Sequence, residues 1–263
     1  MSVAVITVFL YIFVFLFGIV IGSFLNVCIY RIPLKESIVF PHSHCMTCGY
    51  QLRWYDLVPL FSFLFLRGRC RKCHTKLSLQ YPLVEGMNGA LYVIVFLANG
   101  WNYMSVVYCL LTSALIVLSV LDFRTMEIAD GINLFILLLG IAATLLDLHA
   151  WKDHVIGMFS VSVFLLVIYL VTTGRGIGGG DIKLMFAAGF LLGWKATVVG
   201  FFIGLILGGI YGVICLVRRS HGKNDHFAFG PFLSVGLAIT LFCGNDLMNR
   251  YIDFLKAAMN PEM

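Results

Sequence analysis

Long uninterrupted runs of apolar positions dominate the chain, and few stretches alternate between apolar and polar residues. A helix crosses the hydrocarbon core with about 20 apolar residues. The runs predict eight transmembrane helices, over residues 3–30, 83–99, 103–121, 131–146, 155–171, 184–194, 197–217 and 229–244. The segment 184–194 is too short to span unaided, so a re-entrant segment is the alternative there.

The distribution of basic residues decides between these two topologies. With eight crossings and a cytoplasmic loop 31–82, fourteen of the 18 Lys and Arg residues lie inside and four lie outside, namely Lys152, Lys195, Arg250 and Lys256. If 184–194 did not cross, Arg218, Arg219 and Lys223 would move outside. The bias therefore predicts eight spans with both termini outside, which places Asp122, Asp130 and Asp181 on the cytoplasmic side.

The composition agrees with a protein that lies mostly in lipid. Hydrophobic residues make up 60% of the chain and charged residues only 12%, whereas soluble domains have about 25% charged residues. The formal net charge of +5 reflects loop bias, and we expect no nucleic-acid partner. The sequence thus predicts an all-α polytopic membrane protein with one small polar loop domain.

That loop carries two C-x-x-C pairs, Cys45 with Cys48 and Cys70 with Cys73. Two such pairs at this separation are typical of a tetrahedral zinc site. A loop of this length cannot build its own hydrophobic core, so a metal would supply folding energy. We therefore predict a structural four-thiolate zinc in a zinc-ribbon-like loop; a redox pair or an incidental set is the alternative.

Two carboxylates stand at the ends of apolar runs. Asp122 closes the run 116–121, and Asp181 follows the glycine-rich stretch 176–180. Ionisable groups at such positions are functional candidates, although each also suits a helix end. Two carboxylates brought together would share a proton, so that one acts as base on a water and the other as acid toward a peptide carbonyl. Glycine beside them permits close approach of an extended peptide.

At these residues the chain resembles the type IV prepilin peptidase family. The resemblance covers most of the chain and rests on blocks in a fixed order: GSFLNV at 22–27, YRIP at 30–33, the cysteine pairs with DLVP at 56–59 between them, YPLVE at 81–85, GIGGGDIKL at 176–184 and FGPF at 229–232. One block departs from the family, because IAD at 128–130 replaces its usual Leu-Pro-Asp or Ile-Pro-Asp. That leaves Asp130 as an alternative to Asp122 for the partner of Asp181; we favour Asp122.

The resemblance implies a membrane aspartic endopeptidase of the bacterial inner membrane, with catalytic Asp122 and Asp181 facing the cytoplasm and Gly178 and Gly180 in its G-x-G-D motif. It implies cleavage of type IV prepilins or type II secretion pseudopilins after a glycine, and methylation of the new N-terminus with S-adenosylmethionine. It also implies two domains: 1–100, with the four-cysteine loop at about 31–82, and 101–263, the peptidase.

Three other functions remain open from the residues. Asp122 and Asp181 could carry protons or cations in a transporter. A non-catalytic zinc-loop scaffold of a secretion system would explain the cysteines but not the glycine-rich block. A peptidase without methyl transfer would explain both.

Overall fold

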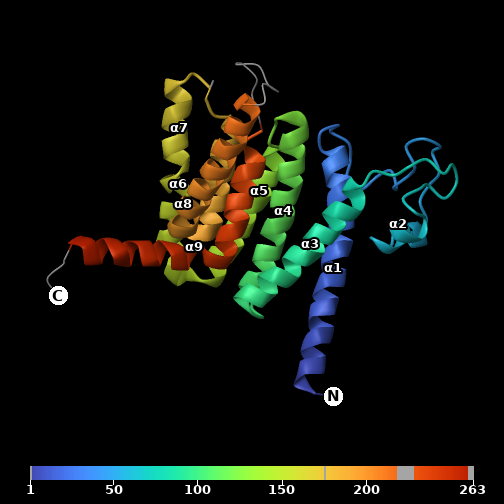
Figure 1. Ribbon diagram of the computed structural model, residues 1–263, viewed down its shortest axis with the longest axis horizontal. Helices are drawn as coiled ribbons and strands as arrows, with labels where there is room; N and C mark the ends of the chain where they lie inside the picture. Colours follow the sequence, from blue (N-terminus) through green and yellow to red (C-terminus); the bar gives the residue numbers. More distant parts are fainter. Residues whose placement is uncertain (1, 175, 218–227, 260–263) are drawn as a thin grey trace. The chain divides into compact units, whose positions relative to one another are not determined.

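The structure is a computed structural model that describes residues 2–174, 176–217 and 228–259. In these residues every regular element is a helix, apart from two isolated β-bridges in the loop, which confirms the all-α class. The chain divides into two compact units, residues 1–117 and 118–263, with the boundary inside α4 (Tyr103–Thr125) (Figure 1). The expected domain boundary near residue 100 stays a prediction.

The first unit is built on α1 (Val3–Arg31) and α3 (Gln80–Asn99), which lie side by side (Figure 1). Glycines on α1 let the two backbones approach closely. A Cβ on Gly18 would lie 2.7 Å from the Gly89 Cα, and a Cβ on Gly22 would lie 2.7 Å from the Glu85 Cα. Small residues at the contact are how helices pack tightly in lipid.

Hydrogen bonds between side chains hold the same unit together. Asn88 is fully buried, and its Nδ2 donates to the Gly18 carbonyl oxygen at 2.7 Å. The Ser113 hydroxyl donates to Asn88 Oδ1 at 2.8 Å and lies 2.9 Å from the Tyr92 hydroxyl. Each polar group in this network has a partner, as burial in an apolar bundle requires.

The loop between α1 and α3 contains a short 3₁₀ helix, η1 (Trp54–Asp56), and a five-residue helix, α2 (Phe61–Phe65). Two bridges, His44 with Gln51 and Arg69 with Lys76, close its cysteine-containing turns. The four-cysteine loop domain that the sequence predicts is therefore present as a folded segment.

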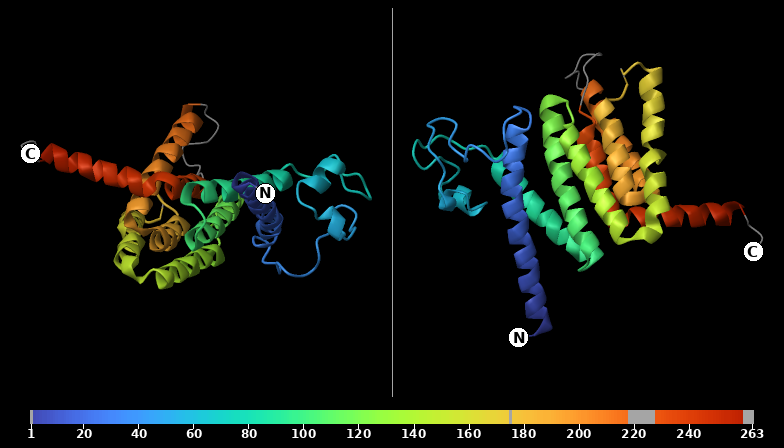
Figure 2. Two further views of the ribbon diagram at one scale, coloured as in Figure 1. Left: turned by 90° about the horizontal axis from the view of Figure 1, so that it is seen from below. Right: turned by 180° about the vertical axis from the view of Figure 1, so that it is seen from behind.

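The second unit contains α5 (Asp130–Leu146), η2 (Leu148–Ala150), α6 (Trp151–Ser160), α7 (Ser162–Val171), α8 (Gly179–Val217) and α9 (Gly230–Met259). Helix α8 packs against α5, α6, α7 and α9, so it is the central element of this unit (Figure 2). Glycines on α8 again make the contact with α9 close: a Cβ on Gly204 would lie 3.0 Å from the Leu233 Cα.

Helix α8 is broken at Gly193, whose backbone is non-helical (φ 77°, ψ 169°). Before the break, Phe186 contacts Phe159 of α6, with ring centroids 5.9 Å apart. After the break, Phe201 contacts Phe164 of α7, with centroids 6.1 Å apart. Because α6 and α7 form one continuous rod from 148 to 171, the chain must reverse direction at Gly193. The two parts of α8, 179–192 and 194–217, therefore form a hairpin, in agreement with the separate segments that the sequence analysis places at 184–194 and 197–217.

By length and composition alone, five helices are long and apolar enough to cross a membrane: Ala4–Arg31, Gln80–Asn99, Tyr103–Thr125, Leu148–Val171 and Gly179–Cys215. A bent pair in α9 makes a sixth, and α5 is a shorter apolar helix. This count takes the α8 hairpin as one helix. The number of eight spans stays a prediction, and Arg218, Arg219 and Lys223, on which it partly depends, lie outside the described residues.

Helix α9 bends by 72° between Gly230–Gly244 and Asp246–Phe254 (Figure 1). Beyond the bend, apolar side chains and polar side chains occupy opposite faces: Leu247, Tyr251 and Phe254 on one, Asn249, Asp253 and Lys256 on the other. The apolar three are 50–68% exposed. This amphipathic pattern is typical of a helix lying in the membrane interface, and the sequence analysis did not predict it.

Candidate active site and metal centre

Asp122 lies near the end of α4 and is 5% exposed. The backbone N–H of Gly230, the first residue of α9, donates to Asp122 Oδ2 at 2.8 Å. A Cβ on Gly230 would lie only 2.6 Å from the same oxygen. Glycine is therefore required here to let α9 present its first N–H to this carboxylate.

Asp181 lies in the first turn of α8 and is 6% exposed. A Cβ on Gly178 would lie 3.2 Å from Asp181 Oδ2, so this glycine leaves room for the carboxylate. A Cβ on Gly180 would lie 2.8 Å from the Cβ of Ile128, in the segment before α5. Gly178 thus permits a close contact with the Asp181 carboxylate, and Gly180 permits a close contact with Ile128.

The end of α4, with Asp122, and the start of α8, with Asp181, lie at the same end of the second unit (Figure 1). Gly180, next to Asp181, packs on Ile128, which follows Asp122 in the chain by six residues. Asp130 is differently placed. Its side chain is 74% exposed, and its Oδ1 accepts from Lys183 Nζ at 2.7 Å. Burial thus favours Asp122 over Asp130 as the partner of Asp181. Asp130 instead links the starts of α5 and α8 through an exposed ion pair.

Gly230 is a site residue that the sequence analysis did not assign. The only signal available was its place in the FGPF block, which we read there as part of a span. Its contact with Asp122 joins residues 108 positions apart, so no local pattern could predict it.

The four loop cysteines form one cluster, as predicted. Their sulfur atoms all lie within 4.8 Å of one another, and Cys45 Sγ is 3.8 Å from Cys73 Sγ. Four sulfurs around a tetrahedral zinc at about 2.3 Å would be about 3.8 Å apart. The donor set and its spacing therefore fit a zinc ion.

The two cysteine turns have the same backbone geometry. In the first, Cys45 N–H donates to the Tyr50 carbonyl and Gly49 N–H to the Cys45 carbonyl, both at 2.8 Å. In the second, Cys70 N–H donates to Thr75 at 2.9 Å and His74 N–H to Cys70 at 3.0 Å. Gly49 and His74 occupy equivalent left-handed positions (φ 66° and 56°). Each turn therefore presents its two thiols in the same way toward the centre of the cluster.

Asp56 connects the two turns. Its carboxylate accepts from Arg71 Nε in the second turn at 2.6 Å and from the Tyr50 hydroxyl of the first at 3.3 Å. Burial works against ionisation of Asp56, but the hydrogen bonds from Arg71 and the Arg53 N–H outweigh it, so its pKa lies below the usual value. Asp56 therefore has a structural ion-pair role in the loop.

Glu85, in α3, anchors the loop to the helices of its own unit. The side chain is 6% exposed, and its Oε2 accepts from the N–H of Leu60 at 2.8 Å. Leu60 holds a left-handed backbone (φ 60°), which a leucine adopts only at a cost. This contact fixes the start of α2 against α3.

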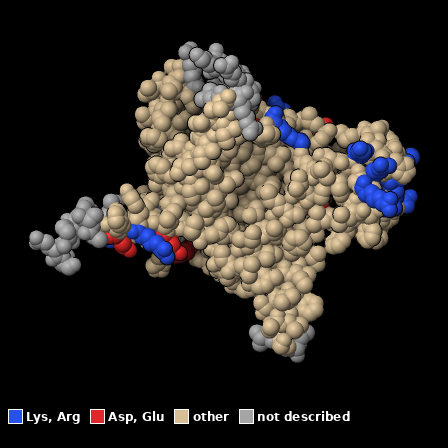
Figure 3. Space-filling view, viewed as in Figure 1, with Lys and Arg blue, Asp and Glu red and all other residues tan. Residues whose placement is uncertain are grey.

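The outer surface of the loop is basic. Six exposed Lys and Arg side chains gather on it (Figure 3): Arg53, Arg67, Arg69, Arg71, Lys72 and Lys76. Beside the first cysteine turn lies a pocket of about 630 Å³, lined by Phe40, Pro41, His42, His44, Gly49 and Gln51. The pocket is shallow, and its lining mixes aromatic and polar side chains.

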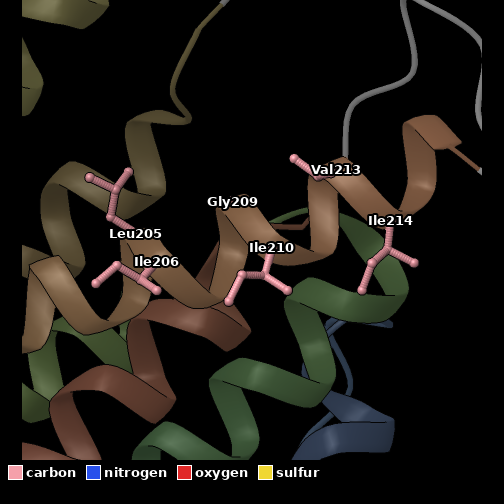
Figure 4. A pocket seen from close by; sticks show the side chains of 6 residues that line it. All are labelled: Leu205, Ile206, Gly209, Ile210, Val213 and Ile214. Carbon is pink, nitrogen blue, oxygen red and sulfur yellow. The ribbon is translucent and has the colours of Figure 1, made fainter.

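A second pocket, of about 490 Å³, lies along the second half of α8 (Figure 4). Its lining is entirely apolar: Leu205, Ile206, Gly209, Ile210, Val213 and Ile214. With no titratable group, it offers a surface for acyl chains or an apolar helix and no reaction chemistry.

Comparison with known proteins gives two family matches. "Bacterial Peptidase A24 N-terminal domain" matches residues 16–99, and "Type IV leader peptidase family" matches residues 109–213. The prepilin leader peptidase/N-methyltransferase of Bacillus subtilis (strain 168) is 33% identical over 90% of this chain and 96% of its own. The protein of the same name from Aeromonas salmonicida (strain A449) is 32% identical over 91% of this chain and 92% of its own. The one from Neisseria gonorrhoeae is 32% identical over 90% of this chain and 91% of its own. No solved structure matches the chain.

Proposed function

This chain belongs to the type IV leader peptidase family, and from that premise we propose that it is a multi-pass membrane aspartic endopeptidase. Its proposed substrates are type IV prepilins or type II secretion pseudopilins, cut after a glycine. The observation that carries the proposal is the pair of buried carboxyl groups, Asp122 and Asp181, at one end of an apolar helix bundle. The transporter and the non-catalytic scaffold are less well supported, because neither accounts for the family match.

The proposed hydrolysis uses one proton shared between the two carboxyl groups. The ionised carboxylate takes a proton from a water, whose oxygen then forms a bond to the carbonyl carbon of the scissile peptide. The protonated partner gives its proton to the carbonyl oxygen. As the carbon–nitrogen bond breaks, the leaving amine takes the proton that the first carboxyl group removed from water. One hydroxyl of the tetrahedral intermediate gives its proton to the second carboxylate, and the product carboxyl group forms. The Gly230 N–H fixes one oxygen of Asp122 during these steps.

We further propose that the chain methylates the new N-terminus. S-adenosylmethionine, when bound, would supply the methyl group: the amine would replace the donor's sulfur at that carbon and release a proton to solvent. The pocket beside the first cysteine turn is our candidate for the donor, because its lining offers Phe40 and His42 to a purine ring and Gln51 to polar groups. The basic loop surface supports the cytoplasmic orientation that the positive-inside rule predicts.

A zinc ion is proposed at Cys45, Cys48, Cys70 and Cys73, where it would have a structural role. The loop contains few large buried side chains, so the metal, the Asp56–Arg71 ion pair and the Glu85 contact with Leu60 would together hold it folded.

The test is cleavage of a synthetic prepilin leader by purified protein, with the product N-terminus read by mass spectrometry. Asp122→Asn and Asp181→Asn should each abolish cleavage in folded protein, because the amide keeps the shape but cannot exchange the proton. Asp130→Asn, the matched control, should retain most activity. An inactive Asp130→Asn beside an active Asp122→Asn would show that we chose the wrong pair, and wild-type protein that never cuts a leader would refute the proposed function.

A further inference from the structure

Hydrolysis consumes a water molecule, yet the proposed catalytic pair lies in an apolar bundle. Buried polar atoms without a protein partner mark the places where proteins hold internal water. In the part of the chain that the structure describes, such side-chain atoms are the amide nitrogen and oxygen of Asn133 and the hydroxyl of Ser234. Asn133 is 6% exposed and Ser234 is 2% exposed.

Ser234 lies one helical turn along α9 from Gly230, the residue that contacts the carboxylate of Asp122. It follows Gly230 by four residues in α9 and so lies on the same helix face. Gly230 is the residue whose N–H bonds to Asp122. Because Cα–Cβ bonds tilt toward the start of a helix, the Ser234 side chain leans toward the N-terminal end of α9, where Gly230 lies.

The register of α5 against α8 places Asn133 about one helical turn further into the bundle than Asp181. At one end of the contact between α5 and α8, Ile128 packs on Gly180, and further along, Gly140 packs on Leu191. The two helices therefore run parallel in nearly the same register, which places Asn133 opposite residue 184, three residues after Asp181. Asn133 belongs to the buried face of α5, as Gly140 does.

We propose that Asn133 and Ser234 hold the water that the carboxylate pair uses, a role that rests on the proposed peptidase function. Each proposed catalytic carboxyl group has one unpartnered polar side chain a turn beneath it. The Asn133 amide can donate to a water and accept from it, and so can the Ser234 hydroxyl. Both are positioning residues, since they act on the reaction through the water.

The test compares Asn133→Leu and Ser234→Ala with wild type in leader cleavage, in methylation of a pre-cleaved substrate, and in thermal unfolding. Ser162→Ala is the matched control, because the Ser162 hydroxyl, at the start of α7, is buried but donates to the Met158 carbonyl oxygen of the preceding helix, α6. We expect each variant to lower kcat by about tenfold, the effect of one lost hydrogen bond to a charged or reacting group. KM should stay unchanged, and Ser234→Thr, which keeps the hydroxyl, should restore activity.

Methyl transfer consumes no water, so methylation of the pre-cleaved substrate should be preserved, as should the melting temperature. Unchanged kcat in both variants would overturn the proposal. So would a raised KM at constant kcat, which would assign the residues to substrate binding, or an equal loss of both activities, which would assign them to folding. A wild-type protein that does not cleave refutes the proposed function instead, and is thus distinguishable from failure of this inference.

Discussion

Replacing Gly230 by alanine should disable the peptidase without unfolding it. The new Cβ would lie 2.6 Å from Asp122 Oδ2 and 3.1 Å from its Cγ, well inside the closest distance that such atoms tolerate. If the Asp122 side chain turns away to relieve this contact, the packing penalty on the free energy of unfolding stays within about 1–3 kcal/mol. Turning away, however, breaks the 2.8 Å hydrogen bond from the Gly230 N–H.

A hydrogen bond to a charged group contributes about 1.5–3 kcal/mol, which corresponds to a loss of roughly 10- to 150-fold in rate if it holds the carboxylate in its reactive position. Displacement of a catalytic group by about 1 Å has a similar cost. We therefore expect kcat for leader cleavage to fall about 100-fold while the melting temperature falls by only several degrees.

The control is Gly131→Ala, at the second position of α5, because a Cβ there meets nothing within 4 Å. Both variants are measured for kcat and thermal unfolding in the same detergent. Wild-type activity in Gly230→Ala would refute the reasoning, since it would mean that neither the hydrogen bond nor the space around Asp122 matters for hydrolysis.

The remaining predictions concern the loop and the glycine-rich block. Purified protein should contain about one zinc per chain, and the double change Cys45→Ser with Cys48→Ser should lower that value and make residues 32–79 sensitive to protease; an ordered loop without metal would contradict this. Asp56→Asn should also raise protease sensitivity in the loop, because it weakens the hydrogen bonds by which this carboxylate joins the two cysteine turns; unchanged proteolysis would show that the two cysteine turns hold together without it. Gly180→Ala should reduce cleavage strongly, whereas Gly179→Ala, in open space, should be tolerated; equal effects would mean that glycine flexibility, and not close packing, is what the block provides.

Local chemistry made part of this molecule predictable from its sequence. Each cysteine turn is closed by hydrogen bonds over four or five residues, so the C-x-x-C spacing alone determines how the thiols are presented. The α5 helix begins at Asp130 and ends at Leu146, one residue from the predicted start and at the predicted end, because no charged residue, Pro or cluster of turn residues interrupts the run after Asp130.

Features that depend on distant contacts were not predictable in this way. The role of Gly230 depends on a contact with a helix that ends more than a hundred residues earlier. The amphipathic end of α9 was missed because its charged residues, among them Arg250 and Asp253, end the apolar run at Gly244. Average hydropathy is high only for segments that are apolar all round. A helix with one polar face has a lower average and is not recognised in this way.

The hairpin at Gly193 has a consequence for the lipid around the protein. Its first arm, residues 179–192, has fourteen residues and is thus about 21 Å long, and the first part of α9, Gly230–Gly244, is of similar length. A typical hydrocarbon core is about 30 Å thick. The second arm of α8 and the helical stretch Leu148–Val171 are long enough to cross that core, so thinning is expected only beside the two short segments. There it would draw the head groups and their water toward Asp181. Vesicles of short-chain lipids should accordingly support faster leader cleavage than vesicles of long-chain lipids.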